Sequence, residues 1–176
     1  MKDQYQTAVD AGLTSEEALK TCARFSRDNA RTPMQWSGKA NAGFTEGTPW
    51  MKVNPNYSEI NVEQQQKEEN SVLHYYQKLI GLRKSEEWKE TFTYGAFAPA
   101  YEQQENIMAF YRILDDGGAC HAAGKKVLIA ANFGKEPANL PLEYQVKRTL
   151  LSNLPENHVS ETLKLAGCGV MVLECV

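Results

Sequence analysis

The strand-like segments that follow one another in the second half of the chain constrain its fold more than any other feature. No helical pattern separates these segments, so crossover helices of the kind that parallel sheets need are not expected. The second half should therefore fold as an antiparallel β-sandwich, which we place at residues 89–176. Short runs rich in β-branched and aromatic residues, bounded by turn residues, predict strands at 91–94, 107–113, 126–133, 147–151 and 169–174.

The first 88 residues predict helices instead. Thr14 and Glu17 fit a capping box, and Gly12 is expected to end an earlier helix. Asn61 can cap a helix that starts at Val62, and a longer helix is expected after residue 70. Two apolar stripes at helical spacing, over 18–25 and 72–80, need a surface outside their own helices against which they can be buried. Left uncovered, they would drive self-association or rest on the sandwich.

Between these helices, residues 26–60 contain three prolines and no regular periodicity, which predicts a long ordered loop. Loops of this length are usually functional or disordered, and the aromatic residues favour order. Its first part gathers Arg27, Asp28 and Arg31 ahead of Pro33. This cluster has two interpretations, a contact site for a ligand or an ion-paired structural loop. The residues expected to anchor the loop are Trp36, Phe44, Trp50 and Tyr57.

Composition excludes several classes of function. A net charge of −3 argues against general binding to nucleic acid or anionic membranes, which depends on clustered basic charge. No apolar run is long enough to span a bilayer, and the polar first residues do not resemble a signal peptide, so we expect a cytoplasmic protein. Four scattered cysteines and three isolated histidines predict reduced, structural thiols and neither a metal site nor a cofactor. These residues are Cys22, Cys120, Cys168, Cys175, His74, His121 and His158.

Several segments together resemble the oligo-1,6-glucosidase branch of the α-amylase superfamily, glycoside hydrolase family 13. The resemblance is most specific in Ser26–Trp36, which reads SRDNARTPMQW, and it continues to Asn61. It extends through YYQKLIGLR at 75–83 and VLIAANF at 127–133. The branch includes α-glucosidases, dextran glucosidases and trehalose-6-phosphate hydrolases, and the resemblance runs from about residue 5 to the end.

The resemblance implies a C-terminal part of a larger enzyme with an α+β fold. Members have a (β/α)₈ catalytic barrel, which takes about 250 residues, followed by an antiparallel sandwich. Residues 1–88 would then be the last barrel helices and a long loop, and the partner of this chain would be the rest of the barrel. The implied activity is retaining hydrolysis of terminal α-linked glucose in oligosaccharides.

The same resemblance places the nucleophile, the acid/base and the stabilising aspartate on barrel strands that lie outside these residues. Retaining hydrolysis needs two carboxyl groups about 5 Å apart. The adjacent glutamates at 16–17, 68–69 and 86–87 are expected to be solvated helix surface, so no catalytic residue is assigned and the chain alone should be inactive. Arg31 is the best match to the family's substrate-binding arginine, Arg27 is second, and Asp28 is expected to orient one of them.

Two other interpretations remain open. The sandwich can be a non-catalytic carbohydrate-binding or stabilising module, or the chain can belong to a non-enzymatic relative such as the heavy chain of an amino-acid transporter. Linkage preference, whether α-1,4, α-1,6 or trehalose phosphate, would be set by barrel loops outside this chain. The aromatic residues that could bind sugar, or could simply pack the sandwich against a barrel, are Trp88, Tyr94, Phe97 and Tyr101.

Overall fold

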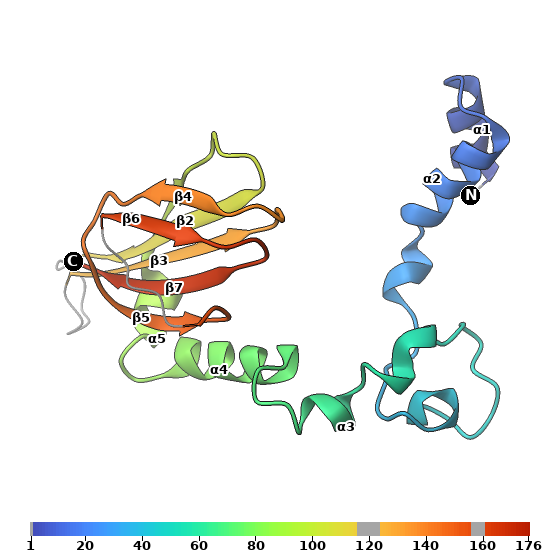
Figure 1. Ribbon diagram of the computed structural model, residues 1–176, viewed down its shortest axis with the longest axis horizontal. Coiled ribbons are helices and arrows are strands. Elements are labelled where there is room, and N and C mark those ends of the chain that lie inside the picture. The colour runs from blue at the N-terminus through green and yellow to red at the C-terminus, as the bar shows by residue number, and fades with distance from the viewer. Residues whose placement is uncertain (1, 116–123, 156–160) are drawn as a thin grey trace. The chain divides into compact units, whose positions relative to one another are not determined.

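The computed structural model describes residues 2–115, 124–155 and 161–176 (Figure 1). The chain forms two compact units, residues 1–69 and 70–176. We describe each unit by itself. No helix in the described residues is both long and apolar enough to cross a membrane.

The first unit is built from short helices joined by a loop. The predicted capping box is confirmed, because the Thr14 side chain accepts from the Glu17 amide while the Glu17 carboxylate accepts from the Thr14 amide at 2.9 Å. Gly12 has a φ of 92° just after the first helix, as expected of a glycine that ends one. The α- and 3₁₀-helices of this unit are α1 (Lys2–Asp10), α2 (Ser15–Arg24), η1 (Arg27–Ala30), η2 (Ala40–Gly43), η3 (Pro55–Ser58) and α3 (Val62–Gln65).

The first unit buries little apolar surface of its own. Ala18 and Cys22 are the buried side chains of α2, whereas Leu19 and Phe25 of the same predicted stripe are 61% and 71% exposed. In the loop, Ala42 is buried but the large side chains point outward. Polar contacts rather than an apolar core therefore hold much of this unit together.

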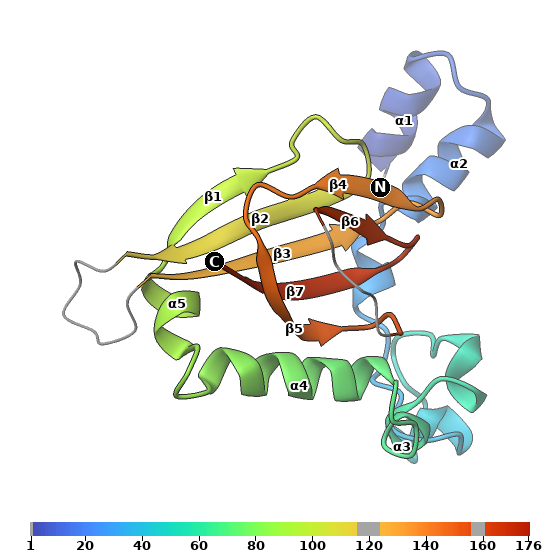
Figure 2. The same cartoon turned by 60° about the vertical axis from the view of Figure 1, so that its left-hand side comes forward.

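Within its described residues, the second unit contains seven strands, and all of their pairings are antiparallel. Five strands form one sheet in the order β1-β2-β3-β7-β5, and two form a second sheet, β4-β6. Figure 2 shows the two-stranded sheet on one side of the larger sheet and the helices α4 and α5 on the other. The elements of this unit are α4 (Val72–Lys84), α5 (Lys89–Tyr94), β1 (Ala96–Ala100), β2 (Ile107–Leu114), β3 (Lys125–Asn132), β4 (Ala138–Pro141), β5 (Val146–Ser152), β6 (Thr162–Leu165) and β7 (Val170–Cys175).

The larger sheet has two apolar faces, because successive side chains of a strand point in opposite directions. In β3, Leu128 belongs to the cluster shared with β4 and β6, whereas Val127 belongs to the cluster on the helical side. In β7, Leu173 and Val172 divide in the same way. Strands buried on both faces explain why these segments read as continuous apolar runs in the sequence.

The helical layer is fixed to the sheet by one tryptophan. Trp88, 2% exposed, packs with Phe92, Val127 and Val172, and Leu79 of α4 packs against the same cluster. The ring centroids of Trp88 and Phe92 lie 6.5 Å apart. Ser71 caps α4 by accepting from the amide of residue 74, which confirms the predicted start of this helix.

The strand predicted at 91–94 is wrong, since these residues belong to α5. Their β-branched and aromatic side chains favour a strand locally, but Trp88 and Phe92 are four residues apart and share one helical face in the core beneath the sheet. Tertiary packing decided the structure here. The first strand is β1, and the strands β4 and β6 were not predicted, because their four-residue lengths give little periodic signal.

The four longer predicted strands are confirmed as β2, β3, β5 and β7. β2 and β3 pair as a hairpin with Leu114 opposite Lys125, and residues 116–123 of its loop lie outside the described residues. The described cysteines, Cys22, Cys168 and Cys175, are unpaired. Cys120 and two of the histidines, His121 and His158, also lie outside the described residues.

Candidate functional site

The loop that carries the predicted site begins where α2 ends. The side-chain amide of Asn29 donates to the carbonyls of Ala23 and Arg24, at 2.9 and 3.1 Å. These carbonyls belong to the last turn of α2, where carbonyls lack i+4 helical donors, and that of Ala23 also accepts from the Ser26 amide at 3.3 Å. Ser26 then caps η1 by accepting from the Asp28 amide at 3.2 Å. The turn into the loop is therefore fixed by side chains.

Gln35 ties the middle of the loop to its end. Its side-chain amide donates to Asn56 Oδ1 at 3.1 Å and to the carbonyl of Ile60. Its own carbonyl accepts from the Val62 amide at 2.9 Å. Contacts across more than twenty residues hold a chain that has no regular structure.

Asn61 completes this frame from the other side. It is 3% exposed, and its side chain donates to the carbonyl of Tyr57 at 2.9 Å while accepting from the Gln64 amide at 3.0 Å. The predicted cap of α3 is confirmed, and the same side chain also closes the preceding turn. One residue thus joins the end of the loop to the start of the helix.

A left-handed turn stabilises the part of the loop between residues 36 and 43. The amides of Trp36 and Ser37 both donate to the carbonyl of Ala42, at 2.9 and 3.0 Å. Asn41, Ala42 and Gly43 have φ values of 53°, 58° and 65°. A Cβ at Gly43 would lie 2.5 Å from Ser37 Oγ, so only glycine fits this close approach.

The prediction that aromatic residues anchor the loop is wrong. Trp36, Phe44 and Trp50 are 51%, 48% and 88% exposed, and Tyr57 is half-buried. Gln35, Asn41 and Asn61 anchor the loop instead, and the side-chain amide of Asn41 donates to the carbonyls of residues 45 and 47. The signal for them was the density of Asn and Gln, whose side chains replace backbone partners in irregular segments.

The three predicted site residues lie on η1 and at its end. Arg27 and Asp28 are in η1, Arg31 follows it, and all three are exposed. Within the part of the chain that the structure describes, no ion pair joins Asp28 to either arginine. The structure therefore places the three on one short segment without pairing them, and it leaves two guanidinium groups for other acceptors.

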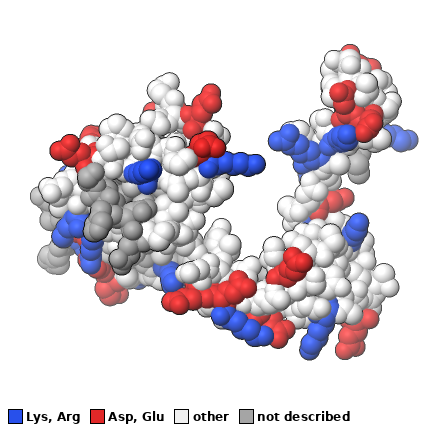
Figure 3. Space-filling model, viewed as in Figure 1, with Lys and Arg blue, Asp and Glu red and all other residues white. Residues whose placement is uncertain are grey.

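The charge around this segment is mixed in sign. Acidic and basic side chains are interspersed on the face shown in Figure 3. In the described residues, no group of three or more His, Cys, Asp or Glu side chains is arranged to hold a metal ion.

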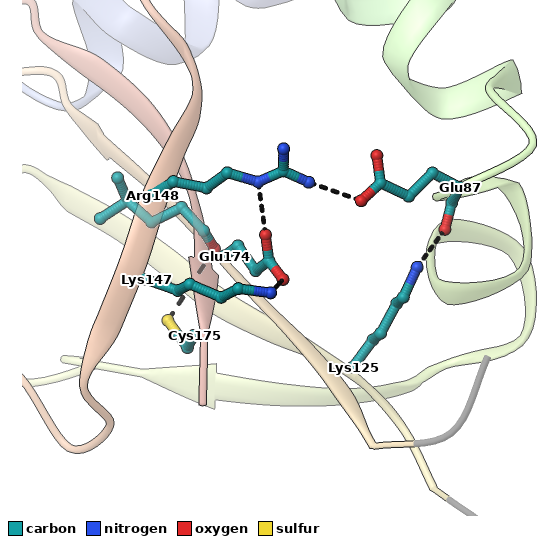
Figure 4. Close-up of polar contacts among 7 residues, drawn as sticks. Glu87, Lys125, Lys147, Arg148, Glu174 and Cys175 are labelled. Carbon is teal, nitrogen blue, oxygen red and sulfur yellow. Dashed lines mark hydrogen bonds and ion pairs between the residues drawn. The ribbon is translucent and has the colours of Figure 1, made fainter.

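A second polar cluster lies in the second unit and surrounds Glu174 of β7 (Figure 4). Glu174 is 6% exposed and pairs with Lys147 Nζ at 2.7 Å and with Arg148 Nε at 2.6 Å. Arg148 also pairs with Glu87, whose backbone carbonyl accepts from Lys125 Nζ at 2.8 Å. The cluster connects the segment before α5 to three strands.

A β-bulge makes this arrangement possible. Neighbouring residues of a regular strand point to opposite faces, so Lys147 and Arg148 would not both reach Glu174. The register between β5 and β7 shifts between Val146 and Arg148, and the extra residue turns both cations toward the carboxylate. Nothing in the sequence marks this shift.

Among the described residues, two carboxylates have displaced pKa values that structural partners explain. Burial alone would raise the pKa of Glu174, but the hydrogen bonds and charges of Lys147 and Arg148 outweigh it and lower the pKa. Hydrogen bonds from Thr14 lower the pKa of Glu17. A glycosidase general acid needs a raised pKa. Neither carboxylate is therefore suited to that role.

The chain is similar in sequence to several known proteins. It is 39% identical over 164 residues to an oligo-1,6-glucosidase from Parageobacillus thermoglucosidasius, a match that covers 90% of the chain and 27% of the relative. It is 35% identical over 176 residues to an oligo-1,6-glucosidase from Heyndrickxia coagulans, covering 99% of the chain and 30% of the relative. A trehalose-6-phosphate hydrolase from Bacillus subtilis is 37% identical over 137 residues, covering 77% and 22%.

Solved structures agree with these matches. An isomaltulose synthase from Klebsiella sp. LX3 superposes with a TM-score of 0.81 and 32% identity, covering 98% of this chain and 30% of that one. The matches thus cover between 22% and 30% of the length of these relatives. The model of the α-amylase catalytic domain matches residues 1–94. The chain therefore belongs to the α-amylase family.

Proposed function

We propose that the protein acts as a retaining glycoside hydrolase that releases terminal α-linked glucose from oligosaccharides, of the oligo-1,6-glucosidase or α-glucosidase type. These residues would supply the C-terminal part of that enzyme. The observation that carries the proposal is the similarity to oligo-1,6-glucosidases of 35% to 39% identity over 90% or more of the chain. We also propose a cytoplasmic location, which unpaired cysteines favour.

Residues 1–88 would be the last helices and the ordered loop of the (β/α)₈ barrel, and residues 89–176 the C-terminal sandwich. The match of the catalytic-domain model to residues 1–94 supports the first part. Exposed apolar side chains in the first unit support it too, because an independent domain would bury them. They are Leu19, Phe25, Met34, Trp36, Phe44, Trp50 and Ile60.

The barrel would also cover one face of α4. Leu79 packs against the sheet, whereas Val72, Tyr76 and Ile80 are 65%, 60% and 49% exposed and lie four residues apart on another face. Without the covering surface, we propose that the chain self-associates through this stripe. Light scattering tests this, since a strict monomer at high concentration would contradict it.

In the complete site, Arg31 would position the terminal glucose. A guanidinium can donate to two adjacent sugar hydroxyls and to a carboxylate together, and Arg31 is exposed without an ion pair among the described residues. The backbone before and after it is fixed by Asn29 and Gln35. Arg27 is the second candidate, and Asp28 would orient one of the two once substrate is bound.

A chimera tests the activity and the role of Arg31 together. The matching segment of the Parageobacillus thermoglucosidasius relative is replaced by this chain, and hydrolysis of isomaltose is measured. The chimera should be active, and Arg31→Ala should lower its kcat/KM by about 30- to 900-fold, which corresponds to about 2–4 kcal/mol of transition-state binding. Lys39→Ala, which removes an exposed cation of the same loop, is the matched control.

Two outcomes would contradict the proposal. A folded chimera that does not hydrolyse any α-glucoside would reject the assigned activity. Equal kinetics for Arg31→Ala and Lys39→Ala would reject the assigned residue.

The 176-residue chain by itself should show no turnover. Of the adjacent glutamates expected on helix surface, only those at 16–17 lie in a helix, because 68–69 and 86–87 lie in the segments between helices and Glu87 pairs with Arg148. Neighbours in sequence do not form the opposed carboxyl pair that retaining hydrolysis needs.

A further inference from the structure

One side chain joins the short helix η1 to the helix that precedes it. Asn29 Nδ2 donates to the carbonyls of Ala23 and Arg24, six and five residues earlier, at 2.9 and 3.1 Å. Among the described residues, no other side-chain hydrogen bond or ion pair runs from η1 to α2. The direction in which η1 leaves α2 therefore depends on the Asn29 amide.

The backbone of Arg31 moves with η1. Arg31 follows this helix directly, and its amide donates to the carbonyl of Asp28 at 3.1 Å. At the other end, the Ser26 hydroxyl accepts from the Asp28 amide. Residues 26–31 thus form one hydrogen-bonded turn, and a change in the direction of η1 displaces the Cα of Arg31. The guanidinium has no ion pair among the described residues that would hold it in place separately.

The contact requires a hydrogen-bond donor at residue 29. Both acceptors are carbonyl oxygens at the C-terminal end of a helix, where the backbone carries partial negative charge. A side-chain amide has two N–H donors, whereas an ionised aspartate of the same shape has none. The change Asn29→Asp therefore removes the link and places a negative charge at the negative end of α2, with almost no change in volume.

We propose that Asn29 is a positioning residue, which fixes η1 so that Arg31 meets the terminal glucose; this rests on the substrate role proposed for Arg31. The arginine side chain is long and flexible, so the place of its guanidinium depends on the backbone from which it starts. A displacement of about 1 Å can cost as much as a hundredfold in rate. Both hydrogen bonds of the Asn29 amide go to α2, so the residue acts through Arg31 and not on the substrate.

A double-mutant cycle in the chimera with the Parageobacillus thermoglucosidasius relative tests this role. On isomaltose, Asn29→Asp should lower kcat/KM about tenfold and raise KM, because binding of the terminal glucose is weakened. In the Arg31→Ala background the same change should alter kcat/KM by less than about twofold, since the group that Asn29 positions is gone. Gln64→Glu is the matched control and should behave like the unchanged chimera. The Gln64 side-chain amide also donates to a carbonyl six residues earlier, that of Ser58, at 3.2 Å.

Two kinetic results would overturn the inference. Equal effects of Asn29→Asp with and without the Arg31 side chain would show that Asn29 acts independently of it. A fall in kcat with unchanged KM would show only that less of the enzyme is folded. If Asn29→Asp does not fold, Asn29→Ala takes its place in the cycle, because it removes the donors without adding a charge.

Failure of the proposed function gives different results. Unchanged kinetics for Arg31→Ala would reject the substrate role of Arg31, and the inference with it. In a chimera that binds isomaltose without hydrolysing it, the assigned activity fails, and the cycle is measured on the dissociation constant by calorimetry. A chimera that neither binds nor hydrolyses isomaltose would reject both.

Discussion

Replacing Glu174 with glutamine should destabilise the second unit, and it should do so only at neutral pH. Glutamine keeps the shape of the side chain but removes the charge that Lys147 and Arg148 share. Because the pKa of Glu174 is lowered in the fold, its contribution is fully present above the usual value of 4.5 and is lost as the pH falls through the folded value. Protonated glutamate and glutamine should then be nearly equivalent.

The size of the effect follows from burial. Breaking a fully buried pair costs about 3–5 kcal/mol. Here the carboxylate side chain is 8% exposed but those of Lys147 and Arg148 are 58% and 50% exposed, so water can take over part of their solvation. We therefore expect a loss of about 1–2 kcal/mol in the free energy of unfolding at pH 7. That corresponds to a decrease of about 4–10 °C in the unfolding midpoint.

Urea unfolding followed by tryptophan emission is a suitable assay. Trp88 is 2% exposed, whereas Trp36 and Trp50 are already 51% and 88% exposed, so the emission change reports mainly on the second unit. The difference between the wild type and Glu174→Gln should shrink as the pH is lowered from 7 to 3. Glu105→Gln should match the wild type at both pH values. A difference that is the same at pH 7 and pH 3 would refute the electrostatic explanation.

Three further changes test the first unit. Gly43→Ala should destabilise it by about 1–3 kcal/mol through the positive φ and the contact with Ser37, and adding Ser37→Ala should restore part of the loss in thermal unfolding. Asn61→Ala should cost about 1–2 kcal/mol because a cap and a buried hydrogen bond are lost, and amide exchange at the start of α3 should speed up; unchanged exchange would contradict this. Below pH 4.5 the helical circular dichroism of the wild type should fall as Glu17 is protonated. The pKa of Glu17 is lowered because its ionised carboxylate accepts hydrogen bonds from Thr14, so protonation weakens the cap of α2. A Glu17→Gln variant should lack this transition.

Local signals in the sequence predicted the features that depend on neighbouring residues. The capping box at Thr14, the cap at Asn61 and the start of α4 at residue 72 each need only three or four residues to form. The longer strands were predicted from their apolar, β-branched runs. The helix at 89–94 was missed, because the packing of Trp88 under a sheet formed by distant residues decides it.

The candidate site was predicted less completely. Family resemblance identified the segment that contains Arg31, and the structure shows that Gln35 and Asn61 hold the loop that follows it. The side-chain partners of Gln35 are 21 and 25 residues away in the sequence, whereas those of Asn61 are three and four residues away. No periodic pattern in the sequence predicts contacts as distant as those of Gln35. The bulge that brings Lys147 to Glu174 could not be predicted from the sequence either, because it is a property of the pairing between two strands.

The position of β7 sets the order in which the second unit can form. This strand lies between β3 and β5, so residues 170–175 join strands that precede them by about twenty to fifty positions. Until these residues leave the ribosome, β3 has one unpaired edge and both apolar clusters lack their central members. The β1-β2-β3 meander can form early, but closure must wait for β7. A pause in translation just before residue 170 should therefore leave an aggregation-prone intermediate.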